Sequence, residues 1–288
     1  MKKKIAFVTD STVYLTEELR QHPDVYVVPI IVISEGNEYE DGIDLTSSEL
    51  YEMIRNQKEV PKTSQPSVGK FVETYEKLKE EYEGAIAIHV SSQLSGTLAS
   101  STSGRTQAEF NVEVIDSNSL SFAITEMLER GIGLANQGRS IEEITQQLKV
   151  QASQSKNYIL LGKLEQLYKG GRMSGAQFLL GNLLQIKPIL SINPGGELDL
   201  FERVRSEKRA LNMLVDLLKR SADNAMVKKV GIMHGNVEEK AAELKDKINA
   251  MLPNVEVIIG EINTSLAVHG GEGTIALFWQ EDDKEFSL

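Results

Sequence analysis

The chain has 288 residues, a formal net charge of −11 at pH 7 and no cysteine. This length predicts two domains, the acidic charge argues against a nucleic-acid partner, and the lack of cysteine excludes disulfides and thiolate metal sites. The apolar run that follows the basic residues 1–4 ends at Asp10, too early for a signal peptide or a membrane span, so we expect a cytoplasmic protein.

The first half of the chain alternates apolar and polar segments in a pattern typical of an α/β domain, which we expect to span residues 1–155 around a mostly parallel sheet. Strands are predicted at 5–9, 25–34, 85–90 and 112–115, and helices at 46–57, 68–82, 97–110, 120–136 and 141–153. Pro29 cannot donate a hydrogen bond to a neighbouring strand, so we expect a bulge or a sheet edge at that position.

The second half, residues 156–288, is predicted to form another α/β domain. Strands are expected at 158–161, 188–192, 197–204, 229–234, 255–261 and 274–279, and helices at 163–168, 207–221 and 237–251. An Asn-Pro-Gly-Gly turn at 193–196 joins two of these strands, so the sheet is mixed or antiparallel. A further helix predicted at 176–186 carries no charge, which indicates either central core or the lining of an apolar ligand tunnel.

The polar turn at residues 91–97 is the clearest candidate ligand site. It follows the buried strand 85–90 and precedes a predicted helix, which is where open α/β sheets bind their ligands. Hydroxyl groups crowd this turn, at Ser91, Ser92, Ser95 and Thr97. One of them would be explained as a helix cap, but four exceed that need. Neutral donors at the positive end of a helix favour one small anionic group, so we predict a carboxylate site.

Two other strands of the first half end in an Asp-Ser pair, Asp10-Ser11 and Asp116-Ser117. Because the carboxyl ends of parallel strands lie at one edge of a sheet, we expect these pairs to face the same mouth as the polar turn. Asp10, Ser11, Ser92 and Thr97 are therefore the expected supporting residues of the site.

Thr63 and His269 are weaker candidates. Thr63 lies in the segment VPKTSQPS, where two prolines keep the backbone extended, and its hydroxyl serves either turn chemistry or a ligand. His269 is favoured among the histidines because two glycines follow it and allow the backbone to approach a ligand. His22 and His89 show no polar constellation of their own and are expected to be structural. The sequence contains no phosphate loop, nucleophile elbow or metal-ligand pair, so we predict no metal and no cofactor.

Seven short motifs occur in order over nearly the whole chain: TDST at 9–12, TSQPS at 63–67, SSQLSGT at 91–97, DS at 116–117, KGGR at 169–172, KPIL at 187–190 and HGG at 269–271. Together they resemble the signatures of the DegV family of fatty-acid-binding proteins. The resemblance implies a two-domain α/β protein that buries a long-chain fatty acid between its domains. In bacteria that have the fatty acid kinase system, such a protein presents the acyl carboxyl group to a separate kinase, which makes acyl phosphate.

Applied to this sequence, the resemblance implies that Thr63, Ser95 and His269 bind the carboxyl group together with the backbone of Gly96. The charge-free helix would line the acyl chain, with Phe178, Leu179 and Leu183. Arg172 and Arg205, expected at the surface, would dock the kinase. Under this interpretation the chain is a lipid-binding subunit without catalytic activity of its own.

Two other classes of function remain open at this point. A hydrolase could use Ser95 as nucleophile and His269 as base, although no third member of a triad can be assigned. A small kinase-like α/β module is the other alternative, and it would have to bind a nucleotide.

Overall fold

The computed structural model describes residues 3–56, 60–172 and 187–282. By their contacts these residues divide into two compact units. The first unit consists of Met1–Thr46, Pro61–Ser153 and Asn263–Ser265, and the second of Ser47–Val60, Gln154–Ile262 and Leu266–Leu288. The predicted domains, 1–155 and 156–288, stay a prediction.

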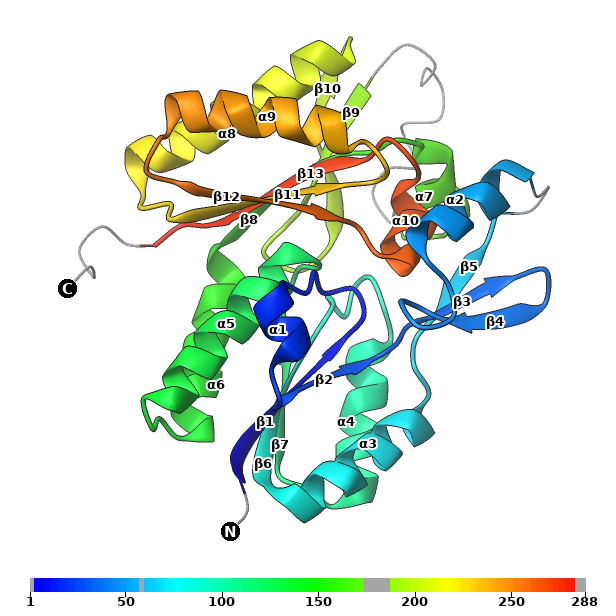
Figure 1. The fold of residues 1–288 in the computed structure, drawn as a ribbon, viewed down its shortest axis with the longest axis vertical. Coiled ribbons are helices and arrows are strands. Elements are labelled where there is room, and N and C mark those ends of the chain that lie inside the picture. The colour runs from blue at the N-terminus through cyan, green and yellow to red at the C-terminus, as the bar shows by residue number, and fades with distance from the viewer. Residues whose placement is uncertain (1–2, 57–59, 173–186, 283–288) are drawn as a thin grey trace. The chain divides into compact units, whose positions relative to one another are not determined.

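The first unit is built on a four-stranded parallel sheet. Its strands are β2 (Val25–Val28), β1 (Lys3–Asp10), β6 (Tyr82–His89) and β7 (Val112–Asp116), in that spatial order. Helices α3 (Val68–Glu81) and α4 (Thr97–Ala108) cover one face, and α5 (Phe122–Asn136) and α6 (Ile141–Gln154) cover the other (Figure 1). A short helix α1 (Glu17–Gln21) follows β1, and its N-cap Thr16 accepts from the Leu19 N–H. The predicted parallel α/β arrangement is therefore confirmed.

Side-chain size on the central strand β6 decides how the helices pack. Ile86 and Ile88 belong to the core cluster formed with α5 and α6, whereas Ala85 and Ala87 face the cluster that contains Phe71 of α3. The alanines leave room for the aromatic ring. Gly104 of α4 serves the same purpose, because an added Cβ would lie 2.5 Å from the Cβ of Phe71. Close packing of α3 on α4 thus supports the end of β6 on which the candidate site lies.

Pro29 divides the predicted strand 25–34. The chain leaves the parallel sheet after β2 and enters a separate antiparallel sheet, in the order β4 (Asn37–Glu40), β3 (Ile31–Ser34) and β5 (Lys62–Ser64). The proline therefore marks a change of sheet at an edge strand, which is the edge that the sequence allowed. The segment VPKTSQPS is extended as predicted, and Thr63 pairs with Val32 of β3.

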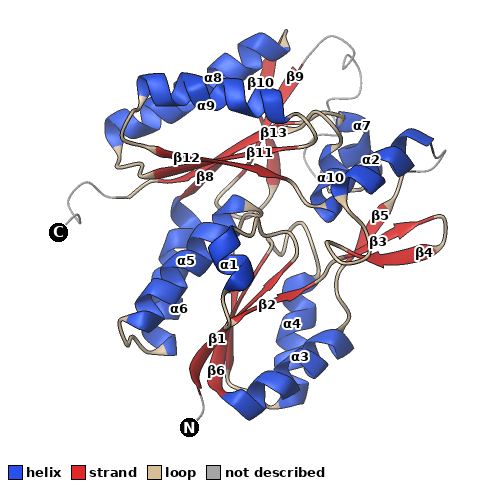
Figure 2. Cartoon of the chain, viewed as in Figure 1, coloured by secondary structure: helices blue, strands red, loops and turns tan. Residues whose placement is uncertain are grey.

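The second unit has a six-stranded mixed sheet. Its order is β10 (Leu198–Val204), β9 (Lys187–Ile192), β8 (Ser155–Leu160), β13 (Ile275–Gln280), β11 (Lys229–His234) and β12 (Glu256–Glu261), and only β11 and β12 are parallel. Helices α8 (Glu207–Asn224) and α9 (Glu238–Met251) pack on one face of the sheet (Figure 2). The antiparallel β9–β10 hairpin is the one predicted around residues 193–196.

Three shorter helices complete the described chain: α2 (Ser47–Asn56), α7 (Leu164–Lys169) and α10 (Thr264–Gly270). The division between the two units falls inside α10, because Thr264 and Ser265 group with the first unit. None of the helices in the described ranges has both the length and the apolar character that crossing a membrane requires. Phe178, Leu179 and Leu183, predicted to line the acyl chain, lie outside the described residues.

Candidate functional site

Three strand ends meet at the carboxyl edge of the parallel sheet, as the sequence predicts. The N–H of Val90, which follows β6, donates to the carboxylate of Asp10 at the end of β1, with an N···O distance of 2.8 Å. The N–H of Ser91 donates to the carbonyl of Ser119 beyond β7 at 2.8 Å. The polar turn at 91–97 is therefore tied on both sides to the loops that follow the neighbouring strands.

The polar turn leads directly into α4. Its N-cap residue is Gly96, which supplies no side-chain hydrogen bond to the first turn of the helix. Just before it, the Ser95 hydroxyl lies 2.8 Å from the Thr97 hydroxyl and accepts a hydrogen bond from the Thr97 N–H at 3.3 Å. The positive end of a twelve-residue helix is thus surrounded by neutral hydroxyl groups, which suits an anionic ligand.

The segment that carries Thr63 reaches the same helix end. A Cβ added at Gly96 would lie 3.0 Å from both Cδ and Nε2 of Gln65 and 3.3 Å from Oε1. The Gln65 amide therefore lies against the N-cap of α4. This contact brings the motifs TSQPS and SSQLSGT together within the first unit, with the partly buried Thr63 two residues from Gln65.

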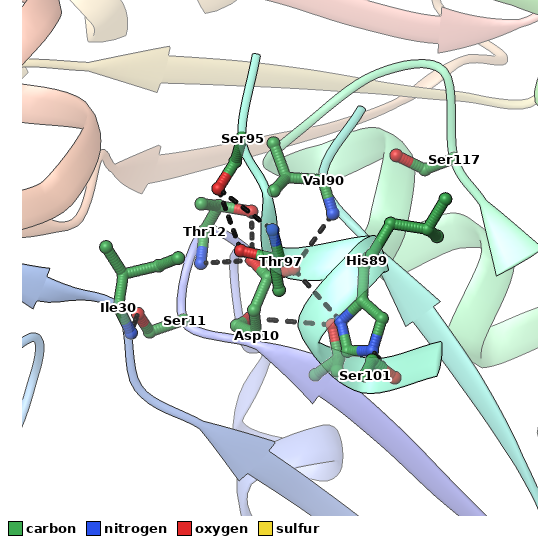
Figure 3. A network of polar contacts seen from close by, with 12 residues as sticks. Asp10, Ser11, Thr12, Ile30, His89, Val90, Ser95, Thr97, Ser101 and Ser117 are labelled. Atoms are coloured by element: carbon green, nitrogen blue, oxygen red, sulfur yellow. Dashed lines mark hydrogen bonds and ion pairs between the residues drawn. The ribbon is translucent and has the colours of Figure 1, made fainter. Parts of the chain in front are cut away.

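A fully buried polar network lies beneath the turn (Figure 3). His89, the last residue of β6, stands between two partners: its Nδ1 is 3.2 Å from Asp10 Oδ2 and its Nε2 is 2.8 Å from the Ser101 hydroxyl of α4. The Ser101 hydroxyl in turn lies 2.6 Å from the Tyr75 hydroxyl of α3. The prediction that His89 lacks a polar cluster is therefore wrong, because its partners come from distant parts of the chain.

Asp10 is the centre of this network. It accepts hydrogen bonds from the Thr12 N–H at 3.0 Å and the Thr12 hydroxyl at 2.6 Å, besides the contacts with Val90 and His89. Burial by itself raises the pKa of Asp10, but the hydrogen bond and charge of His89, with the bonds from Thr12 and Val90, outweigh it and lower the pKa overall. Asp10 is thus ionised at neutral pH and fixes the ends of β1 and β6 relative to each other.

Ser11 belongs to a second buried cluster. Its hydroxyl donates to Asp41 Oδ2 at 2.8 Å and accepts from the Ile30 N–H at 2.9 Å. Thr264 donates to the other Asp41 oxygen, with its N–H at 3.0 Å and also with its hydroxyl. Burial raises the pKa of Asp41, and the hydroxyl donors of Ser265, Thr264 and Ser11 partly oppose that rise. Asp41 therefore holds the start of α10 against the loop after β1.

His269 occupies the last turn of α10 in the second unit, so it belongs to a helix and not to a loop. Its ring packs against Gly170 of the KGGR motif, where an added Cβ would lie 2.8 Å from the ring Cε1. Burial, and then the positive charge of Arg172, lower the pKa of His269 to about 4. The imidazole is therefore neutral at pH 7 and offers one N–H donor.

The two arginines predicted at the surface differ. Arg205 is exposed, as expected. Arg172 is partly buried, and its Nη1 donates to the Gly170 carbonyl at 2.7 Å. Since Arg172 also lowers the pKa of His269, it acts on a predicted head-group residue.

Comparison with known proteins identifies the family. A model of the DegV family, described as uncharacterised, matches residues 4–282. The chain belongs to the DegV family. A DegV domain-containing protein of Listeria innocua is 36% identical over 282 residues, which cover 97% of this chain and 99% of that protein.

Two solved DegV-like structures share the fold. The fatty-acid-binding DegV family protein from Thermus thermophilus has a TM-score of 0.90 and 30% identity, covering 97% of this chain and 100% of that chain. The fatty acid kinase B3 protein of Streptococcus pneumoniae, loaded with linoleic acid, has a TM-score of 0.85 over 97% of this chain and 100% of that chain; at 20% identity this likeness concerns the fold alone. The resemblance seen in the motifs is confirmed, and fatty acid binding occurs in the DegV family.

The predicted site residues of this DegV member are distributed over both units. The first unit contains Asp10, Ser11, Thr63, Ser92, Ser95, Gly96 and Thr97, and the second contains Arg172, Arg205 and His269. The Ser92 N–H donates to the Asp116 carboxylate at 3.2 Å, which ties the supporting residue Ser92 to the end of β7. Among the described residues, no group of three His, Cys, Asp or Glu side chains could hold a metal ion.

Sequence reasoning missed Gln65, His89, Ser101 and Asp41. The sequence does indicate Gln65, because it stands between the candidate ligand Thr63 and Pro66 in a segment that is predicted to be extended. His89 stands directly after the alternating strand AIAI, but nothing in the sequence indicates Asp10 or Ser101 as its partners. Asp41 gave no signal, since its donor Thr264 is 223 positions away.

Proposed function

We propose that this protein binds a long-chain fatty acid, buries the acyl chain and presents the carboxyl group to a separate fatty acid kinase. The observation that carries the proposal is the N-terminus of α4, where the N-cap Gly96 offers no side-chain hydrogen bond and the hydroxyls of Ser95 and Thr97 lie close to the segment of Thr63. The one cation of that segment is the exposed Lys62. The fatty acid binding of the Thermus thermophilus relative supports it.

The carboxyl head group sets the orientation of the ligand. A buried carboxylate without partners would cost several kcal/mol, roughly, so its lone pairs need donors. In the proposed site Thr63, Ser95 and the Gly96 backbone contribute them, and the neutral His269 adds one N–H. Ser92, Thr97, Asp10 and Ser11 support this arrangement. Because all of these donors are uncharged, the carboxyl group is held but not clamped by an ion pair, which suits a group that is passed to another enzyme.

The acyl chain supplies the affinity. Burying about fifteen methylenes gains roughly 12 kcal/mol gross, at about 0.8 kcal/mol each, which exceeds the cost of ordering and association. Phe178, Leu179 and Leu183 remain the proposed lining residues.

The kinase step is a finer proposal and rests on the motif resemblance. Arg205 and Arg172 are the proposed docking residues for the kinase. The exposure of Arg205 supports a role of this side chain in docking. The shared fold with the Streptococcus pneumoniae fatty acid kinase B3 protein is compatible with such a role. We also place the protein in the cytoplasm, where an acyl phosphate would be made and used.

In this proposal the chain itself is not an enzyme. The esterase alternative requires a base for Ser95, yet within the first unit the Ser95 hydroxyl is hydrogen-bonded to Thr97, and both ring nitrogens of His89 are used by Asp10 and Ser101. No observation therefore favours the esterase over the binding protein.

Denaturing extraction of purified protein followed by mass spectrometry tests the proposal. We expect about one long-chain fatty acid per chain, or saturable uptake when the acid is added to delipidated protein. Absence of both would refute the function. The kinase step is tested separately, by measuring acyl phosphate formation with a bacterial fatty acid kinase.

A further inference from the structure

Position 96 requires a glycine because a side chain would have no room there, and not because of its backbone conformation. Its φ of −76° and ψ of 5° are open to any residue. Three atoms of the Gln65 amide, however, lie within 3.3 Å of the place where a Cβ would stand. The side chain missing at position 96 thus makes room for the amide of Gln65.

The backbone of Gln65 is anchored on both sides. The preceding residues belong to β5, which pairs with β3, and the following Pro66 restricts Gln65 to an extended conformation. Two residues further on, Ser67 caps α3 by accepting from the Lys70 N–H at 3.2 Å. The amide is therefore delivered to the N-cap of α4 by a rigid segment.

The Gln65 side chain is exposed and lies against Gly96. The carbonyl oxygen of its backbone accepts from the Ser64 hydroxyl at 3.3 Å, but no hydrogen bond among the described residues involves its side chain. The residue also lines an open cavity of about 280 Å³, whose polar lining includes Ser64, Ser67 and Lys70 and the two carboxylates Glu38 and Glu40. Its two N–H donors are therefore available to a ligand.

We propose that Gln65 is a head-group ligand that selects a carboxylate. This deepens the proposed function and rests on it. A carboxylate that accepts from the first-turn N–H groups of α4 lies beside the N-cap residue, within reach of an amide packed on Gly96. A carboxylate only accepts hydrogen bonds, so it matches the Nε2 donors, and Gln65 adds an uncharged donor to the hydroxyl groups of the site. A fatty alcohol has no second oxygen for this contact.

Binding of oleic acid and oleyl alcohol to delipidated full-length protein tests the assignment. Gln65→Met, which keeps the shape and removes the donors, should weaken oleic acid at least fivefold and change oleyl alcohol less than twofold. Gln65→Glu, which places a negative charge at the same point, should weaken oleic acid more than tenfold. Gln93→Glu is the matched control, because Gln93 is also an exposed glutamine and lies in the polar turn at 91–97. This variant should change the affinity for oleic acid less than threefold.

The outcomes separate the two proposals. If the unchanged protein binds no oleic acid, the proposed function fails and the assignment fails with it. If it binds oleic acid, but Gln65→Met leaves that affinity unchanged or weakens acid and alcohol equally, Gln65 is no head-group ligand while the proposed function stands. Equal losses in Gln65→Glu and Gln93→Glu would also overturn the assignment, since a distant charge effect would explain both.

Discussion

Replacing Asp10 by asparagine changes one atom in the buried network and should unfold the protein more easily. The carboxylate has two acceptor oxygens: Oδ1 receives the N–H and hydroxyl of Thr12, and Oδ2 receives the Val90 N–H and faces His89. Asparagine has one acceptor oxygen and one NH2 group. In either orientation of the amide, the NH2 group faces a backbone N–H, of Thr12 or of Val90, and leaves it unpaired.

The expected cost follows from this count. One buried donor without an acceptor costs about 1–3 kcal/mol, and the hydrogen bonds to a charged group are lost as well, so we expect about 3 kcal/mol. Differential scanning calorimetry should show a Tm lower by roughly 6–12 °C, at about 2–4 °C per kcal/mol. Asp44→Asn is the matched control, because the exposed Asp44 accepts one hydrogen bond from the Glu40 N–H at 2.9 Å. A loss no larger than that of the control would refute the reasoning.

The same residue sets a pH dependence. The pKa of Asp10 is lower in the folded protein than in the unfolded chain, so the folded state binds fewer protons at acidic pH. Its contribution to stability is therefore complete above the ordinary aspartate pKa of about 3.9 and is lost as the pH falls through the lower folded value. As the pH is lowered below about 4, the free energy of unfolding, measured in urea, should therefore fall more steeply in wild type than in Asp10→Asn.

Three further predictions concern the other site residues. Gly170→Ala should lower the free energy of unfolding by about 1–3 kcal/mol, because the new methyl group meets the His269 ring while the φ of −73° is one that alanine accepts. In the double variant with His269→Ala this loss should be relieved, and additive losses in urea unfolding would contradict the reasoning. The pKa of His269 is lowered to about 4 in the folded protein, so as the pH falls this histidine is protonated in the unfolded chain before it is protonated in the folded one. The free energy of unfolding should therefore fall by about 2 kcal/mol between pH 6.5 and 4 in wild type but not in His269→Gln. Ser95→Ala should weaken oleic acid about tenfold, and neither it nor wild type should hydrolyse acyl esters; wild-type turnover that disappears in the variant would favour the esterase.

Much of the fold could be predicted because its signals are local. The strand AIAIHV and the Asn-Pro-Gly-Gly turn each carry their information within a few neighbouring residues. Pro29 indicated an interruption correctly, since a missing N–H has the same effect in any context. The new sheet that begins after it could not be predicted, because β5 pairs with β3 from a position about thirty residues further along the chain.

The candidate site was predictable in its motifs and not in its contacts. Hydroxyl crowding indicated the start of α4, and Asp-Ser pairs indicated the converging strand ends. The network around His89 depends on Asp10, which lies 79 positions away, and on packing that buries Ser101 and Tyr75. The helix that carries His269 is only seven residues long, and its first residue is held by Asp41, so its own sequence gives a weak helical signal.

The interleaved chain path of the two units has a consequence for synthesis. Residues 61–153 emerge from the ribosome long before Asn263–Ser265, which belong to the same unit. Until Thr264 arrives, Asp41 lacks two of its donors, and the Asn263 amide cannot reach the carbonyl of Ser11. A chain stopped short of residue 263 would therefore keep the contacts of Ser11 with Asp41 and Ile30 but lack the hydrogen bonds from Asn263 and Thr264 that complete the loop after β1.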